Sequence, residues 1–229
     1  MKRDESLSSQ IFFNLKLDLK KILNVHRRIR RKSKIKNYYK NHDQIKLHFG
    51  GGKDKLKDFL NTDVIGKIPI DIAKKLPFPT NTVDVIYSCH VIEHLYHKQF
   101  RIFVKESHRI LKKGGIHVIM TPSLTRLIDG LYYNKENKLE LLRGHEKFAK
   151  IKLDPAMIIN WITHILYGHR FIHDLESINR VAKSAGYSVV KIIPFTDIPD
   201  AIVKEYAFMR EKRGNKRWKL ETETFLLIK

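Results

Sequence analysis

The sequence has a single cysteine, Cys89, among its 229 residues. An internal disulfide is therefore impossible and a zinc site built on several cysteines is excluded, so we expect a reducing compartment. The sequence also lacks an apolar run of about 18 residues, which a membrane-spanning helix needs. Its first residues, Met-Lys-Arg-Asp-Glu, do not resemble a signal peptide. These absences predict a cytoplasmic protein.

Acidic residues are scarce, with 24 against 45 lysines and arginines, and the formal net charge is +21. This balance favours acidic partners such as nucleic acid, anionic lipid or phosphorylated substrates. Apolar residues make up 42% of the chain, which is enough for a core and excludes wholesale disorder. The length fits one large domain, or one domain with an appendage.

The positive charge is concentrated at the N-terminus, where residues 1–46 hold 14 lysines and arginines against 4 acidic residues. Residues 8–32 are predicted to form a basic amphipathic helix within an extension that covers residues 1–42. Its apolar positions, at helical spacing, are Ile11, Leu15, Leu19, Ile22 and Leu23. Two roles stay open. Residues 16–40 dock on RNA or on an anionic membrane surface, which would place the protein peripherally at the inner membrane, or the helix packs its apolar side on the core.

From residue 44 onward, short apolar runs alternate with helical patterns. Helices are predicted at residues 98–112, 155–167 and 175–185. Seven runs are strand candidates: residues 45–49, 59–64, 68–70, 83–88, 116–120, 187–193 and 222–228. This alternation predicts an α/β fold with a doubly wound, mostly parallel sheet and helices on both faces. The last strand is compatible with an antiparallel direction, and residues 122–168 are too long for a simple connection, so they form an insert.

Two chemically suggestive segments follow the first two predicted strands. The first ends in Gly50-Gly51-Gly52 and the second in Asn61-Thr62-Asp63. In doubly wound sheets, ligands bind at the carboxyl ends of the strands, where the strand order reverses. Glycine lets the backbone turn sharply near a ligand, and a carboxylate can accept hydrogen bonds from both hydroxyls of a ribose. Taken singly, each segment also fits an ordinary turn. No Walker lysine follows the glycines, which argues against a nucleoside triphosphate.

Segments in order over residues 45–123 resemble the motifs of class I S-adenosylmethionine-dependent methyltransferases, of the kind called type 11. They are LHFGGG (47–52) with FLNTD (59–63), DIAKKLPFPTNTVD (71–84), VDVIYSCHVIEHL (83–95) and RILKKGG (109–115). More loosely, the chain is similar to small methyltransferases associated with bacterial surface-glycan synthesis. The resemblance implies a Rossmann-like seven-stranded sheet with an antiparallel last strand in a domain of residues 43–229. It also implies S-adenosylmethionine as cofactor and the insert 122–168 as a cap on the acceptor side.

The resemblance also assigns roles to single residues, which we take as expectations. The methionine half of the cofactor would be walled by the backbone of Phe49, Gly50, Gly51 and Gly52. The ribose would be held by Asp63, the adenine by Asp71 and Ile72, and the sulfonium would lie near Ser88 and His90. His48 stands where many relatives have an acid. The helix expected after the glycines, residues 53–58, is short, so its dipole would contribute little.

Methyl transfer to a hydroxyl needs a group that takes up the proton, and histidine has a suitable pKa. His90 is our candidate general base or substrate contact, although it could simply be a first-turn helix residue that bonds the backbone. Four further histidines in or after the insert could face the acceptor: His145, His164, His169 and His173.

Residues 90–94 read His-Val-Ile-Glu-His, the H-x-x-E-H spacing of some zinc peptidases. No third ligand is evident in the sequence, and His90 replaces the first glutamate of the E-x-x-E-H motif with which some O-methyltransferases bind magnesium. We therefore predict no metal.

The function predicted from these observations is S-adenosylmethionine-dependent O-methylation of a small-molecule or glycan hydroxyl. One alternative is an RNA methyltransferase that uses the basic surface. The strand at residues 83–88 lacks the N-P-P-Y type motif of enzymes that methylate base amino groups, and no cysteine follows a proline. The other alternative is a non-catalytic scaffold that binds the cofactor and acts through its basic arm.

Overall fold

The computed structural model describes residues 25–165, 168–213 and 216–229. One sheet runs through it, in the order β2-β1-β3-β4-β6-β5. Its strands are β1 (Lys46–Phe49), β2 (Leu60–Asn61), β3 (Val83–Cys89), β4 (Leu111–Pro122), β5 (Val189–Ile192) and β6 (Thr222–Ile228). Only β6 runs against the others. The predicted α/β class, the mostly parallel sheet and the antiparallel last strand are confirmed.

The predicted number of strands is wrong, because the described sheet has six strands and not seven. The candidate at residues 68–70 makes only an isolated bridge, between Asp63 and Pro69. Proline has no backbone N–H and cannot take part in a full ladder, which keeps this segment out of the sheet.

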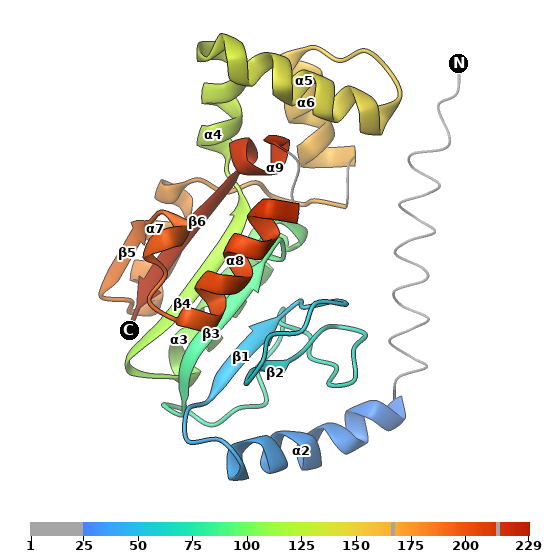
Figure 1. Cartoon of the computed structure of the whole chain (residues 1–229). Coiled ribbons are helices and arrows are strands. Elements are labelled where there is room, and N and C mark those ends of the chain that lie inside the picture. The colour runs from blue at the N-terminus through green and yellow to red at the C-terminus, as the bar shows by residue number, and fades with distance from the viewer. Residues whose placement is uncertain (1–24, 166–167, 214–215) are drawn as a thin grey trace.

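Helices cover both faces of the sheet, as predicted (Figure 1). On one face, α3 (His97–Ile110) and α7 (Leu175–Ala185) bury apolar side chains in the larger core cluster. On the other face, α8 (Ala201–Arg213) packs over β3 and β4 through a second cluster. Strand β3 serves both clusters, because Ile86 points to the first and its neighbours Val85 and Tyr87 to the second.

Two of the three predicted helices form close to their expected bounds. Helix α7 begins and ends at the predicted residues, and α3 covers 97–110 in place of 98–112. The third divides into α6 (Pro155–Asn160) and the π-helical turn η3 (Trp161–Ile165), and residues 166–167 lie outside the described part. Asp154 caps α6 by accepting a 2.8 Å hydrogen bond from the N–H of Met157.

The short helix expected at residues 53–58 does not form. This segment consists of turns, and the side chain of Asn61 occupies backbone groups that a helix would use. Its Oδ1 accepts from the N–H of Leu56 at 2.8 Å, and its Nδ2 donates to the carbonyl of Leu56 at 2.9 Å. The turn after β1 therefore brings no helix dipole to the carboxyl ends of the strands.

Helix α2 (Val25–Lys40) packs across the base of the sheet and shares its core (Figure 1). Its Ile35 and Tyr38 are buried in the larger cluster. The hydroxyl of Tyr38 donates to the carbonyl of Asp58 at 2.7 Å, and Arg31 donates to the carbonyl of Pro69 at 2.9 Å. Residues 25–40 are thus an integral part of the fold. Most of the helix predicted at residues 8–32 lies outside the described residues.

The insert after β4 forms a helical cap with its own apolar cluster, above the carboxyl end of β4 (Figure 1). It contains α4 (Leu124–Ile128), η2 (Asp129–Tyr133), α5 (Lys135–Ala149), α6 and η3. The chain returns to the sheet at a bridge between Ser123 and His173. The remaining elements are η1 (Ile92–His94), η4 (Phe195–Asp197) and α9 (Lys216–Glu221). Within the described residues, no helix is long and apolar enough to cross a membrane.

Candidate functional site

A cleft of about 610 Å³ lies at the carboxyl ends of β1 and β3. These neighbouring strands flank the point where the order of the sheet reverses, since the chain goes from β1 to β2 on one side and then to β3 on the other. Six of the predicted site residues line this one cleft: Gly50, Gly52, Asp63, Asp71, Ile72 and His90. The fold therefore brings together segments that are up to 40 residues apart in the chain.

The turn after β1 requires glycine for steric reasons. Gly50 and Gly52 have φ angles of +69° and +52°, in the left-handed region that side chains rarely adopt. A β-carbon on Gly50 would also lie 2.3 Å from Cγ2 of Val91, and one on Gly51 would lie 2.8 Å from the ring of His48. The turn thus presents bare backbone to the cleft.

Asp63 joins the tip of β2 to this glycine turn. Its Oδ2 accepts a 2.9 Å hydrogen bond from the N–H of Gly52, and its Oδ1 accepts one of 3.2 Å from the N–H of Ile65. Each carboxylate oxygen keeps a further lone pair. The carboxylate is thereby fixed at the cleft wall and can still accept hydrogen bonds from a ligand.

Asp71 provides a second carboxylate on the same cleft. Its Oδ1 accepts from the N–H of Ala73 at 3.1 Å, and Nζ of Lys74 lies 3.7 Å from Oδ2. Its side chain is 35% exposed, whereas the neighbouring Ile72 is 9% exposed and adds an apolar surface. A polar group and an apolar wall side by side suit a flat heteroaromatic ring with an exocyclic amino group.

Three predicted site residues do not line the cleft: Phe49, Gly51 and Ser88. Phe49 is fully buried and packs against Phe103, with 5.5 Å between ring centroids. Ser88 is also buried, and its Oγ lies 3.5 Å from Nε2 of His117. Phe49 and Ser88 face each other in the parallel ladder of β1 and β3, so both side chains point into the core below the cleft.

His48, which stands in place of the usual acid, is buried beside the glycine turn. Its Nδ1 lies 3.0 Å from Oδ1 of Asn61. Burial lowers the pKa of His48, and the hydrogen bond to Asn61 opposes this effect only in part. The ring is therefore neutral at pH 7 and brings no charge to the cleft.

His90 follows β3 in a left-handed conformation, with φ of +52°. Its Nδ1 lies 3.1 Å from Oε1 of Glu93, and its Nε2 lies 3.2 Å from Oγ1 of Thr222. Its side chain is 22% exposed, so the ring is reachable from the cleft. A ligand hydroxyl could replace Thr222 as the partner of Nε2.

Glu93 holds a negative charge directly behind the cleft wall. Its Oε2 accepts a 3.0 Å hydrogen bond from Oγ1 of Thr121, and its side chain is fully buried. Burial raises the pKa of Glu93. The contact with His90 and its charge outweigh this effect, with His94 and His169 adding to it, and bring the pKa to about 2.

The sequence missed Arg170, which lines the cleft in a loop that lies against η1. Its guanidinium lies 5.1 Å from the ring centroid of Tyr96, in a cation–π contact. The N–H groups of Arg170 and Phe171 both donate to the carbonyl of Glu93, at 2.6 and 3.2 Å, and so hold this loop in place. No local pattern indicates such a long-range contact.

None of the four histidines in or after the insert lines the cleft. His145 is buried, with Nε2 at 3.1 Å from Oε2 of Glu221. His173 is buried against the ring of Phe100, with centroids 4.2 Å apart. Gly168 is the only described residue of the insert that lines the cleft.

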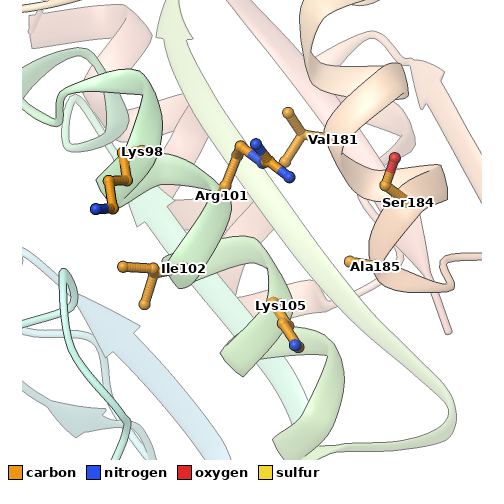
Figure 2. Close-up of a pocket in the computed structure, with 7 residues that line it drawn as sticks. All are labelled: Lys98, Arg101, Ile102, Lys105, Val181, Ser184 and Ala185. Atoms are coloured by element: carbon orange, nitrogen blue, oxygen red, sulfur yellow. The ribbon is translucent and has the colours of Figure 1, made fainter.

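A second, open groove of about 300 Å³ lies between α3 and α7 (Figure 2). Three cationic side chains of α3, Lys98, Arg101 and Lys105, line it. Its apolar lining comes from Ile102 of α3 and Val181 and Ala185 of α7. The groove begins next to the cleft, because Gln99 at the start of α3 lines the cleft itself.

Together, a mostly parallel sheet with one antiparallel strand and a glycine turn facing two aspartates at the reversal point define a Rossmann-like fold. Residues 56–119 match the family described as "Methyltransferase domain", a segment that spans β2, β3, α3 and most of β4. The match covers 64 of the 229 residues and shows that this segment is similar to a methyltransferase domain.

Several solved structures are similar to this chain at low sequence identity. A methyltransferase from Archaeoglobus fulgidus is 14% identical with a TM-score of 0.44, over 89% of this chain and 94% of that one. One from Thermotoga maritima is 13% identical with a TM-score of 0.46, over 82% of this chain and 83% of that one. Phosphoethanolamine N-methyltransferase 2 from Haemonchus contortus, solved with S-adenosylmethionine, is 13% identical with a TM-score of 0.42, over 81% and 48%. None of the curated proteins matches this chain.

Proposed function

We propose that this protein transfers a methyl group from S-adenosylmethionine to a hydroxyl of a small molecule or glycan. The observation that carries the proposal is the convergence of the glycine turn, Asp63, Asp71 and His90 on one cleft. The donor set fits the cofactor, since the two carboxylates can accept hydrogen bonds from ribose hydroxyls and an adenine amino group. When bound, the cofactor supplies an activated methyl group for an in-line displacement.

The residues of the chain then have separate tasks. Asp63 and the bare backbone at Gly50 and Gly52 hold the cofactor, and Asp71 with Ile72 receives its adenine. His90 takes up the acceptor proton at Nε2 after the acceptor hydroxyl has displaced Thr222. Glu93 stabilises the protonated ring through its 3.1 Å contact with Nδ1.

The test is transfer of a radiolabelled methyl group into fractionated cell extract, with His90→Ala and Asp63→Ala compared with the wild type. We expect His90→Ala to keep cofactor affinity but to lose about 10²–10⁴-fold in transfer rate, as for removal of a general base. Asp63→Ala should lose affinity for the cofactor. Full transfer by His90→Ala would refute the role of His90. Cofactor binding without transfer into any fraction would favour the non-catalytic scaffold.

A second candidate is methylation of RNA, and the groove beside the cleft favours it. Lys98, Arg101 and Lys105 lie on one face of α3 and make no ion pair within the described residues (Figure 2). Cations without acidic partners at helical spacing suit the phosphates of a nucleic acid strand.

The RNA candidate is tested by the salt dependence of binding to a single-stranded RNA. Changing the three groove cations to glutamine should reduce the slope of log K against log salt by about 2, because each phosphate contact contributes about 0.7. The matched control replaces three exposed lysines away from the groove by glutamine: Lys135, Lys191 and Lys204. If the slope of log K against log salt falls equally in both variants, the RNA is attracted unspecifically by the net charge. The proposed target is then the hydroxyl of a small acceptor.

A further inference from the structure

Three side chains with metal-binding atoms meet at the wall of the cleft. One ligand atom each from Glu93, His94 and His169 lies within 4.8 Å of the other two. Glu93 and His169 are buried, whereas His94 is exposed and lines the cleft. The cluster therefore has a closed side towards the core and an open side towards the cleft.

The backbone holds this cluster together across a long stretch of sequence. Glu93 and His94 belong to η1, and the N–H of Arg170 donates to the carbonyl of Glu93 at 2.6 Å. Nδ1 of His94 lies 3.4 Å from the carbonyl oxygen of Gly168. The rings of His94 and His169 stand 5.0 Å apart, nearly perpendicular to each other. The loop after the insert is thus fixed against η1, with His169 facing the pair.

One carboxylate oxygen of Glu93 is placed to act as a ligand. Oε2 is occupied by the hydroxyl of Thr121. Oε1 is buried and lies 3.1 Å from Nδ1 of His90, outside the strict geometry of a hydrogen bond. A carboxylate oxygen has more than one lone pair, and carboxylates that bind a metal are commonly hydrogen-bonded as well, so Oε1 can keep its contact with His90 and bind a cation.

The structure also supplies the third ligand that the H-x-x-E-H segment lacked in the sequence. The sequence offered two histidines and no third ligand, but His90 is directed at Thr222 with its Nε2 at 3.2 Å. The fold replaces it with His169, which comes from the other side of the insert. The set that converges is two imidazoles and one carboxylate.

We propose that Glu93, His94 and His169 bind one divalent transition-metal ion of the zinc type, whose open coordination position faces the cleft. Two nitrogen ligands and one carboxylate form a donor set that zinc uses in sites with an open fourth position, whereas magnesium prefers oxygen ligands alone. Zinc bonds of about 2.0–2.2 Å put tetrahedral ligand atoms about 3.4 Å apart, so shifts of about 1 Å would close the cluster around an ion. A water or an acceptor oxygen would occupy the open position.

The experiment uses the full chain, freed of metal with a chelator and titrated with Zn²⁺ in a calorimeter. Co²⁺ absorption in the visible range serves as the readout of coordination geometry. We expect one tight site per chain. His94→Ala and His169→Ala should each weaken it by more than the roughly 10–100-fold typical of residues that only support a ligand. His97→Ala, which removes a nearby exposed histidine outside the cluster, is the matched control and should bind Zn²⁺ as tightly as the wild type.

His94 is exposed, so its removal should not prevent folding, and circular dichroism checks this. The proposal is overturned if folded His94→Ala binds Zn²⁺ like the wild type, or if the wild type takes up less than one ion per chain. It is also overturned if His97→Ala loses as much affinity as the cluster variants. The result does not depend on methyl transfer, because Asp63→Ala should lose cofactor affinity and still bind the ion.

Discussion

A β-carbon built on Gly50 would stand 2.3 Å from Cγ2 of Val91. Gly50 begins the turn after β1 and Val91 follows β3, so the two neighbouring strand ends touch at the cleft. The shape of the candidate cofactor site therefore depends on Gly50 having no side chain.

We therefore expect Gly50→Ala to lower the free energy of unfolding by about 2–5 kcal/mol. Left-handed backbone costs a residue with a side chain about 1–2 kcal/mol, and overpacking adds about 1–3. Gly52→Ala is the matched control, because its φ is +52° but nothing lies within 4 Å of its β-carbon. Urea denaturation should show the larger loss at Gly50, and adding Val91→Ala should restore part of it. Equal losses at both glycines would contradict the steric argument.

The carboxylate of Asp63 accepts a hydrogen bond from the glycine turn and is our proposed ligand of the cofactor ribose. Asp63→Ala should weaken S-adenosylmethionine binding by about 1–3 kcal/mol, measured by calorimetry, because the ribose hydroxyls lose a charged acceptor. Asp63→Asn keeps an acceptor oxygen and should lose less. Asp197→Ala, in η4 and outside the cleft, is the control. Unchanged affinity in Asp63→Ala would remove this residue from the site.

Tyr38 anchors helix α2 with a buried hydroxyl. Its Oη lies 2.7 Å from the carbonyl of Asp58 and 3.2 Å from the N–H of Lys46. Tyr38→Phe leaves these backbone groups without their partner and should cost about 1–3 kcal/mol of stability. The control is Tyr39→Phe, because within the described residues the hydroxyl of Tyr39 bonds a side chain, that of Thr82, and no backbone group. If Tyr38→Phe unfolds at the same denaturant concentration as the wild type, α2 is not anchored as described.

Local signals allowed much of the fold to be predicted. Helix α7 was predicted to the residue because Gly186 ends it in a left-handed conformation, with φ of +105°. Strands β3 and β6 are runs of β-branched and aromatic residues that need no partner to be recognised. Two failures, at residues 53–58 and 68–70, depend on single residues: the side chain of Asn61 bonds the backbone of Leu56, and Pro69 has no N–H for a strand ladder.

Some residues of the candidate site could be predicted from the sequence and others could not. Gly50, Asp63 and Asp71 follow strands directly, so their positions could be inferred from the spacing of motifs and the topology of the sheet. Arg170 and His169 could not, because only the return of the chain after the insert brings them to Glu93. Phe49 and Ser88 were assigned to the cofactor because of their place in a motif. The alternation of side chains along a strand directs both side chains into the core, so the predicted contact of Phe49 with the cofactor would come from its backbone.

The protein should lose stability as the pH falls from 6.5 to 5, since it buries neutral histidines. Burial lowers the pKa of His117 to about 3, and its Nδ1 has no hydrogen-bond partner within the described residues. Burial likewise lowers the pKa of His173 to about 4. In the unfolded chain these rings titrate near 6.5. Below pH 6.5 the histidines of the unfolded state bind protons, whereas the buried rings of the folded state stay neutral. The free energy of unfolding therefore falls as the pH falls.

For His117 alone, this loss between pH 6.5 and 5 should be roughly 1.5 kcal/mol, because one pKa unit corresponds to about 1.4 kcal/mol. His117→Leu should therefore flatten the dependence of the unfolding free energy on pH by that amount, whatever its effect on stability at pH 7. Phe103→Leu is the control, since this ring packs 5.3 Å from His117 and carries no proton, so it should change stability without changing the slope. Denaturant titrations at several pH values measure both. If the unfolding free energy of His117→Leu depends on pH as steeply as that of the wild type, His117 is protonated in the folded protein. This result would contradict the burial of its neutral ring under α3.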